Sequence, residues 1–172
     1  MKNKKIIIAE VGINHNGNIL RAKKLIKICK NIGADYVKFQ SFKTELLASS
    51  KSKKSKYQIS GTNKNKSLFT MLKKHELTFK NMKSLFSYAK KIKMPIISTP
   101  FDTSSVDELE KLGMSLYKIS SSDINNIPLI EHIAKKNKKI IISTGRSNIK
   151  DIDIALKYII KNKNNKISIL HC

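Results

Sequence analysis

Hydrophobic and polar positions change their spacing at regular intervals along the chain. Short apolar runs rich in β-branched residues are typical of buried strands, and each is followed by a stretch whose apolar residues recur at helical spacing. The first run lies in IIIAEVGINHNG, residues 6–17, which begins as a strand and ends in a polar, glycine-rich turn. Further strands are predicted over residues 34–42, 94–102, 115–123, 138–145 and 166–172. The chain therefore repeats one strand–turn–helix unit.

Amphipathic helices are predicted between these strands, over residues 19–32, 68–72, 78–91, 106–112, 126–135 and 148–160. Ser104 and Ser105, together with Glu108, give the start signal for the helix at 106–112. Lys, Ser and Asn dominate residues 43–67, where periodicity is almost absent. We therefore predict a long loop there, with one short apolar contact at 57–59.

Alternating strands and helices without hairpin signals indicate a parallel sheet with crossover helices. Such a sheet is either open and doubly wound or closed into a barrel. No G-x-G-x-x-G loop follows the first strand, which weakens the dinucleotide-binding version of the open sheet. Polar residues at the ends of nearly all strands favour the barrel, whose sites draw on many strands. We predict an α/β fold, a (β/α)8 TIM-type barrel that is incomplete here, with about six of the eight units.

The net charge of +23 at pH 7, from 35 basic and 12 acidic residues, is compatible with nucleic-acid binding. Only Arg21 and Arg146 are arginines, however, and the lysines are spread over the whole chain without interleaved aromatic residues. We therefore interpret the lysines as solvated faces and expect no nucleic-acid partner. A small anionic substrate fits the same charge.

The sequence gives no signal for a membrane or for export. No apolar run reaches the ~18 residues that a membrane span needs. The first apolar run is too short for a signal peptide, because it meets Glu10 at once. Cys29 and Cys172 have neither disulfide nor metal-site spacing. We expect a reduced, cytoplasmic setting and no membrane partner.

Polar side chains gather at the predicted carboxyl ends of the strands. They are Glu10, Lys38, Gln40, Ser98, Thr99, Lys118, Ser121, Asp123, Ser143, Thr144 and His171. Alternation places Lys38 and Lys118 on inward faces, where a lysine loses hydration and must recover it from an anion, a carboxylate or a Schiff base. Hydroxyls of Thr99, Ser121 and Ser143 would satisfy phosphate or carboxylate oxygens.

Glu10, Gln40 and Asp123 suit the hydroxyl and amide groups of a sugar. Simpler interpretations exist, because hydroxyls at strand ends commonly cap helices and an inward lysine can pair structurally with a neighbouring carboxylate. Two other functions are also compatible with the sequence. One is a Schiff-base lyase or aldolase that uses Lys38 or Lys118, and the other is a basic nucleic-acid-binding module.

Six segments resemble a known enzyme family. AEVGINHNG, VKFQSF, ISTPFD, YKISSSDINNIPLI, ISTG and LHC occur in the order and spacing of the sialic acid synthases, and the resemblance covers essentially the whole chain. These bacterial enzymes make N-acetylneuraminate, legionaminate or pseudaminate. The resemblance implies a homodimeric transferase that condenses phosphoenolpyruvate with an N-acetylated hexosamine of the mannosamine type and releases phosphate.

The resemblance also implies roles for the residues at the strand ends. Phosphoenolpyruvate would be bound by Lys38, Thr99, Lys118, Ser121 and Ser143, and the sugar would face Glu10, Gln40 and Asp123. Glu10 and the two lysines would be the catalytic side chains. Many relatives carry Glu where this chain has Asp123, which bears on the choice of sugar.

The family uses a divalent metal, Mn²⁺ or Mg²⁺, to polarise the sugar aldehyde. Its two histidine ligands lie on strands seven and eight, and a C-terminal antifreeze-like domain follows them. These segments have no counterpart in residues 1–172, and His171 belongs to the strand-six segment. We therefore predict no metal ligand in this chain. We interpret it as the N-terminal portion of the synthase barrel and expect this portion alone to be inactive.

Overall fold

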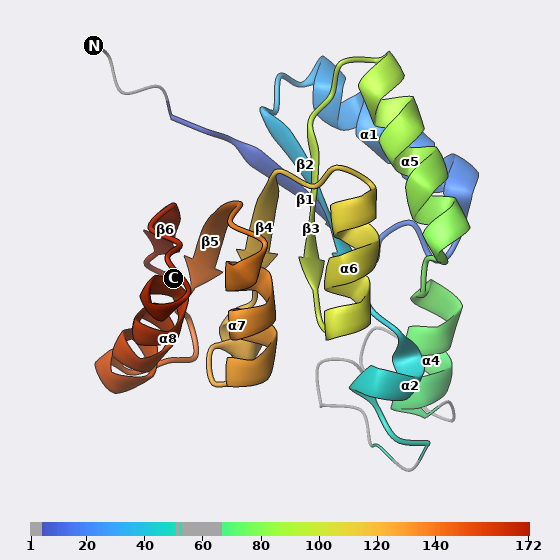
Figure 1. Cartoon of the computed structure of the whole chain (residues 1–172). Coiled ribbons are helices and arrows are strands. Elements are labelled where there is room, and N and C mark those ends of the chain that lie inside the picture. The colour runs from blue at the N-terminus through green and yellow to red at the C-terminus, as the bar shows by residue number, and fades with distance from the viewer. Residues whose placement is uncertain (1–4, 51, 53–66) are drawn as a thin grey trace.

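The computed structural model describes residues 5–50, 52 and 67–172 of the chain. Six parallel strands form one sheet, in which strands that are consecutive in sequence lie side by side (Figure 1). They are β1 (Ile8–Gly12), β2 (Tyr36–Ser41), β3 (Ile96–Pro100), β4 (Leu116–Ile119), β5 (Lys139–Ser143) and β6 (Ile167–Leu170). This sequential parallel order is that of a TIM-type barrel, so the predicted fold class with six βα units is confirmed.

Helices follow the strands and cover one face of the sheet (Figure 1). They are α1 (Ile19–Asn31), α2 (Thr44–Leu47), α4 (Leu68–His75), α5 (Phe79–Lys91), α6 (Thr103–Lys111), α7 (Ile127–Lys135) and α8 (Ile149–Lys161). Side chains of Asn18, Ser67, Thr78, Asp102, Asn126 and Asn148 cap their first turns. Each cap satisfies a backbone N–H that the helix itself leaves free.

Alternation along the strands separates the core from the site. Val37 and Phe39 are fully buried between the sheet and the helices. The buried Tyr117 also faces outwards, since its hydroxyl donates to the carbonyl oxygen of Val106 in α6 at 3.3 Å. Residues at the intervening positions, such as Lys38, face inwards, as predicted from the period of two.

The structure differs from the prediction in three segments. The stretch predicted as a loop contains the short helix α2, and residues 57–59 lie outside the described part. Helix α6 begins at Thr103, three residues earlier than predicted, because Asp102 and not Ser104 or Ser105 is its cap. The predicted fourth strand ends at Ile119 and continues as a 3₁₀ turn, η1 (Ser121–Asp123).

The inner face of the sheet is apolar at the amino ends of the strands. A cavity of about 550 Å³ lies there, with Ile6, Ile8, Tyr36, Leu116, Ile141 and Ile167 in its lining. In the described part of the chain, β1 and β6 each pair along one side only. The polar residues lie at the opposite, carboxyl ends of the same strands.

Candidate functional site

A polar cavity of about 270 Å³ opens at the carboxyl ends of the strands. Its lining consists of Glu10, Lys38, Gln40, Thr99, Phe101, Lys118, Ser120, Ser121 and Ser143. Five consecutive strands, or the turns directly after them, contribute these side chains. Seven of the eight residues predicted for the site are therefore brought together in one place.

Lys38 is buried, with 9% of its surface exposed, and is held by two neighbouring strands. Its Nζ lies 2.6 Å from Glu10 Oε2 and donates to Thr99 Oγ1 at 3.0 Å. Glu10 and Lys38 are register partners in the parallel pair β1–β2, so the sheet itself sets this ion pair. The Glu10 side chain is half exposed and reaches the open part of the cavity.

Lys118 is equally buried but has no carboxylate partner among the described residues. Its Nζ donates to Ser143 Oγ at 2.5 Å and to the carbonyl oxygen of Ile119 at 2.8 Å. Burial, reinforced by the positive charge of Lys38, lowers the pKa of Lys118 to about 8. This ammonium group is therefore poorly compensated, and an anion in the cavity would stabilise it.

Gly12 keeps the backbone close to the Glu10 carboxylate. The register between β1 and β2 shifts between Glu10 and Gly12, and Gly12 has φ +53°, which favours glycine. A Cβ atom at this position would lie 3.1 Å from Glu10 Oε1 and 3.7 Å from Gln40 Nε2. A side chain at position 12 would therefore crowd the Glu10 carboxylate, while its distance to Gln40 is an ordinary van der Waals contact.

Asp123 is the predicted site residue that does not line the cavity. It lies at the end of η1, where its carboxylate accepts from Ser122 Oγ at 3.0 Å and from Asn126 Nδ2 at 3.4 Å. Sequence reasoning did not assign Ser120 and Phe101, which do line the cavity. The alternation that placed Lys118 inwards also indicates Ser120, two residues later.

His15 is a buried polar residue of the β1–α1 turn that was given no role. Its Nδ1 accepts the backbone N–H of Gly17 at 3.0 Å, and its ring lies 5.9 Å from that of Phe39 between centroids. Burial, followed by the nearby His75, lowers the pKa of His15 to about 4. The side chain is therefore neutral at pH 7 and shapes the turn behind the cavity.

The described residues contain no group of three or more His, Cys, Asp or Glu side chains that could hold a metal ion. The polar cavity offers one carboxylate, on Glu10, and this carboxylate is paired with Lys38. The residues in place therefore do not fit a divalent metal. Within the described ranges, no helix is long and apolar enough to cross a membrane.

Known proteins resemble the chain along nearly its whole length. The N,N'-diacetyllegionaminic acid synthase of Campylobacter jejuni is 48% identical over 171 residues, covering 98% of this chain and 51% of that protein. The enzyme of the same name from Legionella pneumophila is 36% identical over 170 residues, covering 96% of this chain and 48% of that protein. The chain thus spans about half the length of these curated relatives.

A solved structure shows the same arrangement of strands and helices. The N-acetylneuraminic acid synthetase of Leptospira borgpetersenii, in complex with citrate, superimposes with a TM-score of 0.82 at 29% identity. The match covers all of this chain and 57% of that one. The sequence model of the NeuB family matches residues 25–172. The chain therefore belongs to the NeuB family of sialic-acid-type synthases.

Proposed function

We propose that this chain forms the phosphoenolpyruvate-binding part of a nonulosonic acid synthase. The observation that carries the proposal is Lys118, a buried ammonium group beside the Ser143 hydroxyl and without a contacting carboxylate. Lys38 and Thr99 lie across the same cavity and offer a second charged donor and a second hydroxyl. Charge-assisted hydrogen bonds of this type suit the phosphate and carboxylate groups of phosphoenolpyruvate.

Glu10 supplies the negative charge next to Lys38. We infer that bound phosphoenolpyruvate replaces Glu10 as the anion that contacts Lys38. The half-exposed Glu10 carboxylate is then available to bind the second substrate. Gln40, on the same inner face as Lys38, would complete the contacts to the sugar. The two lysines then stabilise negative charge that redistributes during the reaction.

The reaction we propose joins the methylene carbon of phosphoenolpyruvate to the aldehyde carbon of an open-chain, N-acetylated hexosamine. Water adds to the carbon that bears the phosphate, and inorganic phosphate leaves. Each turnover therefore consumes one water and releases one phosphate.

The names of the two curated relatives favour a particular sugar. Both are N,N'-diacetyllegionaminic acid synthases, so their product carries two acetamido groups. We infer that the sugar substrate here is a diacetamido hexose of the mannosamine type. The position of Asp123 outside the cavity is compatible with a contact to a substituent distant from the aldehyde.

The test replaces the two buried lysines in the protein expressed from its full reading frame. Each charge-assisted contact is worth ~1.5–3 kcal/mol, so Lys38→Ala and Lys118→Ala should raise the KM for phosphoenolpyruvate more than about tenfold. The KM for the sugar should change much less. Lys83→Ala, an exposed lysine of α5, serves as the control. An unchanged KM for phosphoenolpyruvate in either variant would remove that lysine from the site.

A Schiff-base lyase is the second candidate, and the pKa of Lys118, lowered to about 8, favours it. A neutral amine is needed to attack a carbonyl, and a lowered pKa provides more of it at pH 7. Borohydride reduction in the presence of pyruvate would trap such an adduct on Lys118. Mass spectrometry showing no pyruvate adduct would exclude this candidate and leave the synthase proposal intact.

A further inference from the structure

The ends of β2 and β3 are fastened together directly beyond the polar cavity. The hydroxyl oxygens of Ser41 and Ser98 lie 2.8 Å apart, and the backbone N–H of Phe101 donates to the Ser41 carbonyl at 3.0 Å. The rings of Phe42 and Phe101 meet edge to face, with centroids 6.4 Å apart. The strand ends that carry Gln40 and Thr99 therefore continue into a shared, packed segment.

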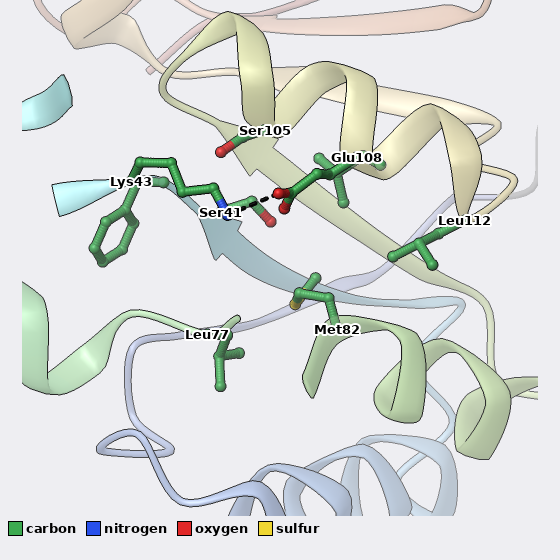
Figure 2. A pocket seen from close by; sticks show the side chains of 9 residues that line it. Ser41, Lys43, Leu77, Met82, Ser105, Glu108 and Leu112 are labelled. Atoms are coloured by element: carbon green, nitrogen blue, oxygen red, sulfur yellow. Dashed lines mark ion pairs between the residues drawn. The ribbon is translucent and has the colours of Figure 1, made fainter. Parts of the chain in front are cut away.

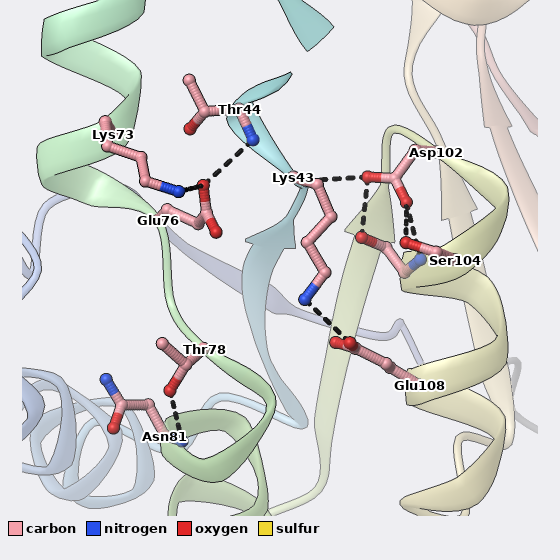
Figure 3. Close-up of polar contacts among 10 residues, drawn as sticks. Lys43, Thr44, Lys73, Glu76, Thr78, Asn81, Asp102, Ser104 and Glu108 are labelled. Atoms are coloured by element: carbon pink, nitrogen blue, oxygen red, sulfur yellow. Dashed lines mark hydrogen bonds and ion pairs between the residues drawn. The ribbon is translucent and has the colours of Figure 1, made fainter. Parts of the chain in front are cut away.

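Asp102 is the centre of this segment. Its buried carboxylate accepts four hydrogen bonds (Figure 3). Three come from α6, namely from Ser104 Oγ at 2.8 Å, Ser105 N at 2.7 Å and Ser105 Oγ at 2.8 Å. The fourth comes from the backbone N–H of Lys43, which follows β2, at 2.8 Å to Oδ2. One side chain thus caps α6 and also holds the chain that leaves β2.

The side chain of Lys43 makes a second connection to the same helix. Its Nζ lies 2.7 Å from Glu108 Oε1, one turn further along α6 (Figure 2). Leu77, Met82 and Leu112 lie around the ion pair, and the void among them is only about 10 Å³, at most the size of one water. About 30% of each partner is exposed, so the pair is partly shielded from solvent.

The next residue is held from the opposite side. Helix α2 has no capping side chain of its own. Instead, the backbone N–H of Thr44 donates to Glu76 at 3.0 Å, and Lys73 lies 3.2 Å from the same carboxylate oxygen (Figure 3). The backbone N–H groups of Lys43 and Thr44, at the start of α2, are therefore satisfied by two carboxylates, of Asp102 before α6 and of Glu76 after α4.

We propose that Asp102 is a positioning residue of the polar cavity. By holding the Lys43 backbone, with Glu108 holding the Lys43 side chain, it keeps the end of β2 at a fixed distance from β3. This distance sets where Gln40 and Phe101 stand and keeps Lys38 in contact with Thr99. The proposal rests on the proposed function and names a residue that shapes the substrate site without touching substrate.

A helix cap alone is a weaker explanation of Asp102. A helix cap needs only one side-chain acceptor for the first backbone N–H groups. Asp102 Oδ1 meets this need by accepting the N–H of Ser105. The contact at Oδ2 joins Asp102 to a residue 59 positions earlier in sequence, which capping does not require. Only two residues separate Asp102 from Thr99, which lines the cavity. A shift of Asp102 would therefore also move Thr99.

The test variant is Asp102→Asn in the protein expressed from its full reading frame. Asparagine is about as effective a helix cap as aspartate, because its side-chain oxygen can still accept the Ser105 N–H. Its amide nitrogen then faces the Lys43 N–H, donor against donor, so the contact to β2 is lost while α6 is kept. We expect the KM for phosphoenolpyruvate to rise about fivefold or more, with a smaller change in kcat. Glu108→Gln, which weakens only the Lys43 ion pair, should show a smaller effect in the same direction.

Asp107→Asn is the matched control. It likewise removes one carboxylate charge, here from within α6, and weakens the contacts of 2.7 Å to His132 and to Lys136, on the side away from the cavity. It should lower the melting temperature without changing the KM for phosphoenolpyruvate. If Asp102→Asn behaves like Asp107→Asn, the positioning role is wrong and Asp102 is a structural cap.

Hydrogen exchange separates this proposal from the proposed function. In Asp102→Asn, the amides of residues 43–44 and those of residues 38–40 should both exchange faster than in the wild type. Loss of protection at 43–44 alone would overturn the proposal, whether or not the wild type uses phosphoenolpyruvate. A wild type that neither binds nor consumes phosphoenolpyruvate would contradict the proposed function, and the exchange at residues 38–40 would still decide the role of Asp102.

Discussion

The two inward lysines, Lys38 and Lys118, differ in how their buried positive charges are compensated. Lys38 contacts the carboxylate of Glu10 at 2.6 Å, so its charge is compensated inside the protein. Lys118 has only a hydroxyl and a carbonyl oxygen, and its pKa falls to about 8. Sequence reasoning placed both lysines inwards, because the period of two is local. It could not assign Glu10 to one of them, because that depends on the register between strands.

The buried charge of Lys118 should lower the free energy of unfolding when no anion is bound, by an amount that depends on pH. Its pKa is about 8 in the folded chain and ordinarily 10.5. Burying the charge is therefore unfavourable below pH 8, by on the order of 3 kcal/mol. Between pH 8 and pH 10.5 the unfolded chain binds more protons at Lys118 than the folded chain does. The destabilisation therefore disappears as the pH rises from 8 to 10.5.

We predict that Lys118→Met stabilises the protein at pH 7 by about 1–2 kcal/mol, after allowing for the donors lost to Ser143 and Ile119. The gain should vanish near the unperturbed pKa, while phosphoenolpyruvate binding is lost. Urea unfolding at pH 7 and pH 10 measures this difference. Lys139→Met, at an exposed position of β5, is the control. An equal gain at both pH values would show that the charge of Lys118 is not the cause.

At the scale of elements, the strands and long helices could be predicted because their signals lie within each segment. Helix α2 could not be predicted, because its first N–H groups are satisfied by Asp102 and Glu76, which are far away in sequence. The start of α6 was misplaced for a related reason. Ser104 and Ser105 look like caps, but both donate their hydroxyls to Asp102, the residue that caps the helix.

The β1–α1 turn and the end of α4 are joined by a close backbone approach. Gly17 has φ +75°, and a Cβ atom there would lie 2.2 Å from the carbonyl oxygen of Lys74. Gly113, after α6, has φ +82° with no atom within 4 Å of the same point. The two glycines therefore share the backbone conformation and differ in the space around them.

We predict that Gly17→Ala lowers the free energy of unfolding by about 3 kcal/mol or more, because strain and a backbone clash add. Gly113→Ala should cost only about 1–2 kcal/mol, the strain of a left-handed residue with a side chain. Urea unfolding of both variants isolates the contribution of the clash. Equal losses would mean that α4 moves freely away from the turn.

At the scale of the molecule, six parallel strands leave two edges and an apolar inner face. The outer strands β1 and β6 pair along one side only in the described part of the chain. Ile6 is 64% exposed and Leu170 is 40% exposed, and both line the cavity of about 550 Å³ at the amino ends of the strands. Unpaired edges and exposed apolar surface promote association with other chains.

We predict that residues 1–172, produced alone, self-associate and lack synthase activity. The edges and the apolar face favour association, while the net charge of +23 opposes it by mutual repulsion. Salt screens this repulsion, so the associated fraction should rise between low salt and ~0.5 M salt. Association through the lysines themselves would instead weaken as salt is added. Sedimentation velocity at the two salt concentrations therefore identifies the surface responsible.

The expected inactivity has a separate chemical reason. The cavity supplies donors for an anion, but the described residues hold no group of three or more side chains that fits the metal implied for the sugar aldehyde. An assay with Mn²⁺, phosphoenolpyruvate and N-acetylmannosamine or a diacetamido hexose should therefore yield no phosphate, even if phosphoenolpyruvate binds. Turnover by a folded monomer of residues 1–172 would contradict both parts of the prediction. It would mean that these six units close their own inner face and hold every group that the reaction needs.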